Sequence, residues 1–202
     1  MKLVIFGATS AIAIAVARHY ALRGATLHLV ARDSARLEEL RRDLIVRGAE
    51  AVTAAHADLT DTQNHASLVA NARAQLGVID LALSCYGALP SQSDCEQNIG
   101  DLLQNFDINA TSALALLTEL AKVLEAQKEG QLAVVTSVAG DRGRRSNYAY
   151  GASKAAVSTF AEGLRARLHS SGVGVIDIRP GLVDTPMTAY LPKGPLFSSP
   201  EQ

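Results

Sequence analysis

Short apolar runs alternate with longer helix-like segments along nearly the whole chain of 202 residues. The strand-like runs cover residues 3–6, 27–30, 52–55, 79–83, 132–136 and 173–178. Runs that are apolar at almost every position are typical of parallel strands, which are buried on both faces. The alternation therefore predicts an α/β fold in which helices cross over between the strands of one parallel sheet.

The intervening segments carry helical patterns over residues 11–22, 35–46, 62–75, 99–124 and 149–168. The first of these contains an isoleucine alternation that imitates a strand, but its alanine content, its length and the stop signal Gly24 favour a helix. We expect the helix over 99–124 to be interrupted or bent near Asn109. Right-handed crossovers and a glycine turn after the first strand predict the order 3-2-1-4-5-6, the doubly wound parallel sheet of the Rossmann fold.

No linker, repeat or low-complexity stretch interrupts this pattern, so we expect residues 1–202 to form a single domain. The sequence ends on Ser199-Pro200-Glu201-Gln202, which combines a capping serine, a proline at the first helical position and an acid in the first turn. We therefore expect the natural protein to continue into a last helix and one more strand.

Charge and cysteine content exclude several classes of function. The net charge is -1 and no basic stripe is present, so nothing favours binding to nucleic acid. Cys85 and Cys95 are too few and too irregularly spaced for a disulfide framework or a metal site, which favours a reducing cytoplasm. The apolar stretch after Met1-Lys2 resembles a secretory signal, but residues 7–10 interrupt it where a signal core should be helical. We expect a cytoplasmic protein, peripheral to a membrane only if residues beyond 202 bind one.

The segment Gly7-Ala8-Thr9-Ser10-Ala11-Ile12-Ala13 lies between the first predicted strand and the first predicted helix. At that point the pyrophosphate of a dinucleotide would meet a helix N-terminus, and the turn needs a glycine and small neighbours. Only one residue of the segment is glycine, so a tight strand-to-helix turn without a ligand remains the alternative.

The second predicted strand ends in Ala31-Arg32-Asp33. An acid at the strand tip would bind the adenosine ribose of NAD, whereas an arginine close by accepts the 2′-phosphate of NADP. Because Ala31 occupies the tip and Arg32 follows it, the sequence favours NADP(H) over NAD(H). The alternative is that Arg32 and Arg36 pair with Asp33 or Glu39 on a solvated helix.

Tyr150 and Lys154 are four residues apart, which places them on one face of a helix. A lysine ammonium near a phenol favours the phenolate, so we expect the pKa of Tyr150 to fall below its usual value of about 10. Such a phenol can exchange a proton with an alcohol or a carbonyl. The alternative is an ordinary tyrosine and lysine on the solvated side of a helix.

Taken together, these motifs resemble the short-chain dehydrogenase/reductase family over nearly all 202 residues. Gly7, Asp58, Asn109, Ser137, Tyr150 and Lys154 follow the order and spacing of the family. The segment 179–185 is similar to its proline-glycine segment beside the nicotinamide. The resemblance implies cofactor contacts from Gly7, Thr9, Ser10, Ala11, Ile12, Arg32, Asp58, Leu59, Gly87, Tyr150, Lys154, Pro180, Gly181, Val183 and Thr185.

The resemblance also implies four catalytic roles. Tyr150 would be the acid in reduction and the base in oxidation, and Lys154 would lower its pKa and hold the nicotinamide ribose. Ser137 would hydrogen-bond the substrate carbonyl, and Asn109 would anchor a water molecule in a proton relay. Taken singly, Ser137 could instead be a strand-end cap and Asn109 a satisfied polar group of a helix.

The chain departs from the family at Leu83-Ser84-Cys85-Tyr86-Gly87, where only the final glycine of the usual Asn-Asn-Ala-Gly is present. The departure puts the usual backbone and adenosine contacts of that segment in doubt. We interpret Cys85 as a small buried residue rather than a reactive thiol.

Two segments bear on the substrate. Asp141-Arg142-Gly143-Arg144-Arg145 follows Ser137 and could hold a phosphate near the mouth of the pocket, or be a solvated or subunit-contact loop. Residues 182–202 are expected to begin a substrate lid that covers an apolar ligand. The glycine segment, residues 87–92 and the arginine-rich loop resemble the ketoreductase component of polyprenyl-phosphate pentose epimerases. That resemblance implies a phosphorylated, lipid-linked keto sugar, which would explain both the arginines and an apolar lid.

The leading hypothesis is an NADP(H)-dependent oxidoreductase that interconverts a carbonyl and a secondary alcohol. A non-catalytic NADP(H)-binding sensor or assembly module is the second hypothesis, and a nucleotide-sugar epimerase of the extended branch is the third. Apolar surface on the helices over 99–124 and 149–168, together with the family resemblance, implies a homodimer or a homotetramer.

Overall fold

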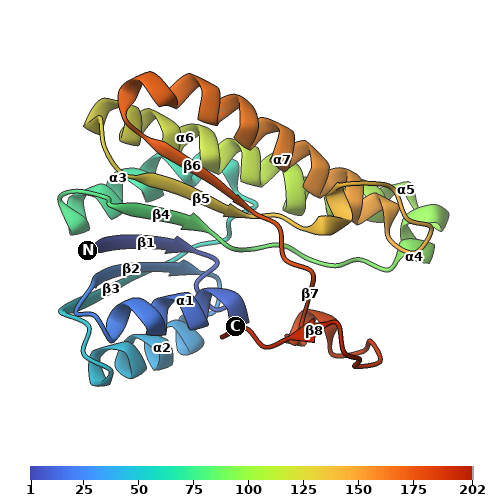
Figure 1. Ribbon diagram of the computed structural model, residues 1–202, viewed down its shortest axis with the longest axis horizontal. Helices are drawn as coiled ribbons and strands as arrows, with labels where there is room; N and C mark the ends of the chain where they lie inside the picture. The colour runs from blue at the N-terminus through green and yellow to red at the C-terminus, as the bar shows by residue number, and fades with distance from the viewer. Residues whose placement is uncertain (202) are drawn as a thin grey trace.

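Parallel strands form the central layer of the protein, which is known here from a computed structural model describing residues 1–201 (Figure 1). The strands of this sheet are β1 (Lys2–Phe6), β2 (Thr26–Ala31), β3 (Ala51–His56), β4 (Leu81–Ser84), β5 (Gln131–Val135) and β6 (Gly174–Ile178). Their order across the sheet is β3-β2-β1-β4-β5-β6, and every neighbouring pair is parallel. The predicted doubly wound topology is therefore confirmed.

Helices cover both faces of the sheet (Figure 1). One face packs against α1 (Ala11–Ala21) and α2 (Ser34–Val46), and the other packs against α3 (His65–Leu76), α6 (Ser112–Gln127) and α7 (Tyr148–Leu168). The central strand β1 serves both cores, since Leu3 and Ile5 face α1 while Val4 and Phe6 face the opposite layer. This double burial explains why the sequence of the strand is apolar without alternation.

The predicted helix over 99–124 is divided into three parts. These are α5 (Ile99–Phe106), the π-helical segment η2 (Asp107–Thr111) and α6. The interruption expected near Asn109 is thus confirmed, and it takes the form of a π-helix, a rare feature that often marks functional sites. The short helix α4 (Gln92–Gln97), which precedes α5, was not predicted from the sequence.

Several short elements complete the chain. The 3-10 helix η1 (Thr62–Asn64) forms the first turn of the predicted helix over 62–75. Three further 3-10 helices are η3 (Val138–Gly140), η4 (His169–Ser171) and η5 (Pro186–Thr188). After β6, the two-residue strands β7 (Leu182–Val183) and β8 (Phe197–Ser198) pair in parallel. In Figure 1 this pair lies beyond the carboxyl end of the sheet, near the start of α1.

The helix start predicted at residues 199–202 falls partly outside the described residues. Within them, Pro200 and Glu201 lie in a turn. None of the helices described over residues 1–201 is long and apolar enough to cross a lipid bilayer.

Helix α7 approaches the turn after β5 unusually closely. A Cβ atom on Gly151 would lie 2.5 Å from the carbonyl oxygen of Ala139, and one on Gly140 would lie 2.8 Å from the backbone nitrogen of Ala155. Because no side chain fits at either position, the two glycines set the distance between α7 and η3.

We predict that Gly151→Ala destabilises the protein by about 1–3 kcal/mol, because the added methyl group must push α7 away from η3. Gly163→Ala on the same helix is the matched control, since a Cβ atom there meets nothing within 4 Å. That change should stabilise the helix by up to about 1 kcal/mol. Denaturant unfolding of both variants measures the difference, and equal effects would contradict the close packing.

Candidate active site

The predicted site residues gather where the strands end. The turns after β1, β4, β5 and β6 carry Gly7, Gly87, Ser137 and Pro180, and they meet at the carboxyl edge of the sheet, where the strand arrows end near the centre of Figure 1. Ligands of open α/β sheets bind at this edge, where the strand order reverses. Here the reversal lies between β1 and β4.

The turn after β1 has the geometry of a close backbone approach. Gly7 has a φ of +79°, and a Cβ atom on it would lie 2.6 Å from the carbonyl oxygen of Cys85. Ser10 caps α1 by accepting a hydrogen bond from the backbone nitrogen of Ala13 at 3.2 Å. The first residues of the helix, Ala11 and Ile12, thus present backbone N–H groups of a helix N-terminus to the edge of the sheet.

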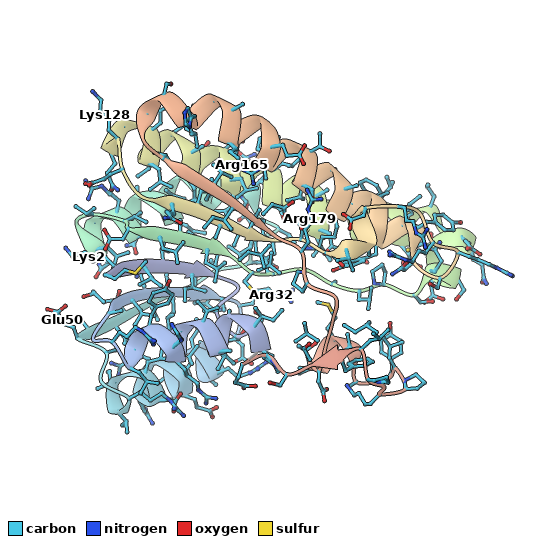
Figure 2. All side chains as sticks on the ribbon, in the orientation of Figure 1. Lys2, Arg32, Glu50, Lys128, Arg165 and Arg179 are labelled. Atoms are coloured by element: carbon cyan, nitrogen blue, oxygen red, sulfur yellow. The ribbon has the colours of Figure 1, made fainter. Side chains whose placement is uncertain are left out.

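Two arginines flank this turn. Figure 2 shows Arg32 at the carboxyl end of the sheet, and its side chain is exposed. Within residues 1–201 it forms no ion pair, so the alternative of a pairing on a solvated helix is not what the structure shows. Arg36, which sequence reasoning did not assign to the site, donates from Nη2 to the carbonyl oxygen of Thr9 at 3.1 Å.

The two residues predicted after β3 differ in environment. Asp58 is exposed, and hydrogen bonds from the backbone and the hydroxyl of Thr60, with help from the charge of Arg32, lower the pKa of its carboxyl. Leu59 is 5% exposed and belongs to the core, and its carbonyl oxygen accepts a hydrogen bond from Nε2 of His65. Of the two, only Asp58 therefore offers an exposed side chain at the edge.

Asn109 holds the loop after β4. Its Oδ1 accepts from the backbone nitrogen of Ala88 at 3.0 Å, and its Nδ2 donates to the carbonyl oxygen of Ala88 at 2.9 Å. A Cβ atom on the neighbouring Gly87 would lie 2.5 Å from Oδ1 of Asn109 and 3.3 Å from Nζ of Lys154. Asn109, Gly87 and Lys154 are therefore in direct proximity.

Tyr150 and Lys154 lie one turn apart near the start of α7. The Lys154 ammonium is 5.8 Å from the centroid of the Tyr150 ring and donates to the carbonyl oxygen of Val135 at 3.3 Å. A hydrogen bond links Tyr150 to Ser137, whose hydroxyl also accepts from the backbone nitrogen of Ala139 at 3.1 Å. The structure thus brings all four predicted catalytic residues together.

The expected fall in the pKa of Tyr150 is wrong for this structure. Burial raises the pKa of Tyr150 to about 12, and the hydrogen bond with Ser137 opposes that rise only in part. Burial also lowers the pKa of Lys154 to about 8, against the charges of Cys85 and Asp177. Desolvation dominates because the ammonium lies over the ring face and bonds to a backbone carbonyl, not to the phenol oxygen.

The buried carboxylate of Asp177 lies close enough to Lys154 for its charge to act on the ammonium. Asp177 accepts from Thr136 Oγ1 at 2.5 Å and from Arg179 Nε at 2.6 Å. Burial raises its pKa, but these hydrogen bonds outweigh burial and keep the pKa below its usual value. Arg179, labelled in Figure 2, also pairs with Asp141 and Glu162, so the end of β6 is fixed to α7.

The departure from the family motif after β4 has a structural explanation. The hydroxyl of Tyr86 lies 3.1 Å from Ser112 Oγ, so this side chain points into the core under α6 and not toward the edge. Cys85 lies 3.1 Å from Ser10 Oγ, and burial raises the pKa of its thiol. The interpretation of Cys85 as a small buried residue is confirmed.

The segment after β6 lies against the first turn of α1. A cavity of about 240 Å³ lies between Ile12 and this segment. Its other lining residues are Pro180, Gly181, Leu182, Val183, Leu196, Ser198, Ser199 and Pro200. Thr185 caps η5, and its backbone nitrogen donates to Thr188 Oγ1. Ile12, from the segment predicted to meet the pyrophosphate, and the residues predicted to flank the nicotinamide thus line one cavity.

The arginine-rich loop lies next to the turn that carries Ser137. Arg144 Nη1 donates to the carbonyl oxygen of Val138 at 3.1 Å, while Arg142 and Arg145 are exposed. In the predicted lid segment, Lys193 pairs with Asp184 and lies 4.7 Å from the ring centroid of Phe197. Tyr190 and Leu196 of the same segment are exposed.

Comparison with known proteins agrees with this geometry. A family model described as short chain dehydrogenase matches residues 2–195. An uncharacterized oxidoreductase of Mycobacterium tuberculosis is 37% identical over 199 residues, covering 98% of this chain and 80% of the relative. An uncharacterized oxidoreductase of Streptomyces coelicolor is 37% identical over 188 residues, covering 93% of this chain and 74% of the relative.

Among solved structures, actinorhodin polyketide ketoreductase with NADPH superimposes with a TM-score of 0.86 at 25% identity, covering 93% of this chain and 72% of that one. Fold and site thus define an oxidoreductase with a doubly wound sheet. The chain belongs to the short-chain dehydrogenase family.

We predict that Lys154→Met raises the thermal unfolding temperature at about pH 7, because the variant no longer buries a charged amine. The pKa of Lys154 is about 8 in the folded protein and 10.5 ordinarily, so the unfolded chain binds this proton more tightly. The wild type therefore gains stability as the pH rises from about 8. The difference in unfolding temperature between the variant and the wild type should be smaller at about pH 9.5 than at about pH 7. A variant that unfolds at a lower temperature than the wild type at about pH 7 would contradict this.

Proposed function

We propose that the protein is an NADP(H)-dependent oxidoreductase that interconverts a carbonyl group and a secondary alcohol. The observation that supports this most directly is the cluster of Ser137, Tyr150, Lys154 and Asn109 at the end of the sheet where the strand order reverses. A phenol beside a hydroxyl donor and a lysine is suited to moving a proton to or from an oxygen atom.

The residues at the edge fit a dinucleotide phosphate. Gly7 permits close backbone approach, and the N-terminus of α1 supplies N–H donors for a pyrophosphate. Arg32, with Arg36 next to the turn, would bind the 2′-phosphate, and the solved relative with NADPH is consistent with this choice. When bound, the nicotinamide would supply or accept the hydride.

The remaining predicted cofactor contacts divide between the two ends of the dinucleotide. Asp58 and the backbone of Leu59 and Gly87 would lie near the adenosine side. The segment from Pro180 to Thr185 would flank the nicotinamide, with Gly181 and Val183 lining the cavity beside Ile12.

The catalytic steps follow from the chain's own groups. Ser137 would hydrogen-bond the substrate oxygen, and Tyr150 would donate a proton to it in reduction or remove one in oxidation. With its pKa near 12, Tyr150 is protonated at neutral pH and therefore ready to act as an acid. Lys154, charged below a pH of about 8, would stabilise the phenolate left after transfer and hold the nicotinamide ribose. Asn109 would hold a water molecule that returns the proton.

For the substrate, we propose a phosphorylated or lipid-linked keto sugar. Arg142 and Arg145 are exposed in the loop whose Arg144 bonds the carbonyl oxygen of Val138, and they are able to bind a phosphate by charge-assisted hydrogen bonds. The exposed Tyr190 and Leu196 in the lid offer apolar cover for a lipid. A homodimer or a homotetramer is proposed as well, since Ile99 on α5 is 67% exposed.

We predict that Tyr150→Phe lowers turnover by about 10²- to 10⁴-fold while cofactor binding is retained, because only the proton donor is removed. The measurement is NADPH consumption against a panel of ketones that includes phosphorylated keto sugars and their neutral counterparts. Tyr190→Phe in the lid is the control for loss of a hydroxyl.

This experiment also separates the enzyme from a non-catalytic sensor. A wild type that binds NADPH yet consumes none with any ketone would support the sensor, and full activity in Tyr150→Phe would remove the proposed mechanism. Preference for the phosphorylated ketones would support the proposed substrate class.

We predict that Arg32→Ala weakens NADPH binding by about 10- to 100-fold, since a charge-assisted hydrogen bond is lost. NADH lacks the 2′-phosphate, so its affinity should change by less than about 3-fold. Titration calorimetry with both cofactors measures this, and Arg23→Ala, on a distant surface turn, is the control. Equal weakening for NADPH and NADH would mean that Arg32 does not contact the phosphate.

A further inference from the structure

Ala149, the residue before Tyr150, is held on both sides of its backbone by amide side chains from other helices. Its N–H donates to Oε1 of Gln92 at 2.9 Å, and its carbonyl oxygen accepts from Nδ2 of Asn105 at 3.0 Å. Gln92 begins α4 and Asn105 lies near the end of α5. Neither residue carries a role in the proposed mechanism.

The contact with Gln92 takes the place of a helix cap. The N-cap residue of α7 is Asn147, whose side chain makes no capping hydrogen bond. The first N–H groups of a helix lack partners within it, and a buried one is costly to leave unpaired. Ala149 is 2% exposed, so Gln92 supplies from a distant segment the acceptor that Asn147 does not.

The contact with Asn105 extends to the predicted catalytic asparagine. Asn105 is 3% exposed, and its Oδ1 accepts from Nδ2 of Asn109 at 2.7 Å. Asn109 in turn grips the backbone of Ala88, next to Gly87. A continuous chain of hydrogen-bonded amides therefore runs from the half-buried Gln92 through the backbone of Ala149 to the buried Asn105 and Asn109 and on to Ala88.

We propose that Gln92 and Asn105 are positioning residues, which fix the backbone directly before Tyr150 and set Asn109 relative to it. This rests on the proposed function, in which Tyr150 moves the proton. Neither amide bonds the phenol oxygen of Tyr150. Gln92 and Asn105 bond the backbone of Ala149, and Asn105 also bonds the side-chain amide of Asn109, so they affect where the catalytic groups lie and not the proton transfer itself. A displacement of about 1 Å at such a site can cost about 100-fold in rate.

The chain supplies a matched control with the same chemistry at the opposite end of the sheet. Gln127 Oε1 accepts from the backbone nitrogen of Ile79 at 3.0 Å, and its Nε2 donates to the carbonyl oxygen of Ile79 at 2.8 Å. Like the pair Gln92 and Asn105 at Ala149, Gln127 therefore hydrogen-bonds both the N–H and the carbonyl of a residue distant in the sequence. Gln127→Leu removes an equivalent contact far from Tyr150.

The test compares Asn105→Leu, Gln92→Leu and Gln127→Leu in kcat, KM for ketone and NADPH, and unfolding temperature. Asn105→Leu and Gln92→Leu should lose about 10- to 100-fold in kcat with KM changed less than about 3-fold. Gln127→Leu should lose similar stability and keep its kcat. Gln92→Glu retains the acceptor for the Ala149 N–H and should restore most of the kcat lost in Gln92→Leu.

A double variant shows whether the effect passes through Tyr150. Asn105→Leu added to Tyr150→Phe should lower kcat no further than Tyr150→Phe alone, because effects acting through one group are not additive. Full additivity would overturn the proposal. So would equal kcat in Asn105→Leu and Gln127→Leu, or losses in all variants that only follow the unfolding temperature.

Failure of the proposed function is recognised separately, from a wild type that consumes no NADPH. In that case amide hydrogen exchange over residues 148–154 decides the positioning. Asn105→Leu and Gln92→Leu should speed exchange there by about 10-fold or more, as expected for local opening, while Gln127→Leu leaves it unchanged. Exchange that is the same in all three variants would overturn the positioning role.

Discussion

The site depends above all on the contact between α7 and the turn that follows β5. The absence of a side chain at Gly151 and Gly140 lets the helix backbone lie directly on η3. This contact brings Tyr150 to Ser137 and buries Lys154 against the end of β5. A wider spacing would open the phenol to water, and the desolvation that now sets the pKa values of both side chains would weaken.

Burial, and not the pairing of charges, governs the electrostatics of the site. It raises the pKa of Tyr150 to about 12 and lowers that of Lys154 to about 8, so each group moves toward its neutral form. The buried carboxylate of Asp177 is held ionised by Thr136 and Arg179, and its negative charge opposes the lowering of the pKa of Lys154. Functional groups arranged in this way cost stability, which is common where a site must move protons.

Much of the site could be predicted because the carboxyl ends of parallel strands meet at one edge. Gly7, Ser137 and Pro180 each follow a strand, so their proximity follows from the sheet order alone. The break at Asn109 was also predicted, although its π-helical form was not. Leu59 shows the limit of such reasoning, because its position after β3 is that of a cofactor contact while its side chain belongs to the core.

The amino-acid order alone was enough to predict the alternation of strands and helices, the order of the sheet and the residue types at its edge. These depend on periodicity and on local turn chemistry, which are properties of neighbouring residues. The direction of the pKa shifts and the hydrogen bonds of Gln92 and Asn105 to Ala149 became known only from the folded structure. Those features arise from burial and from contacts between residues 57 and 44 positions apart, whose distances no local pattern encodes.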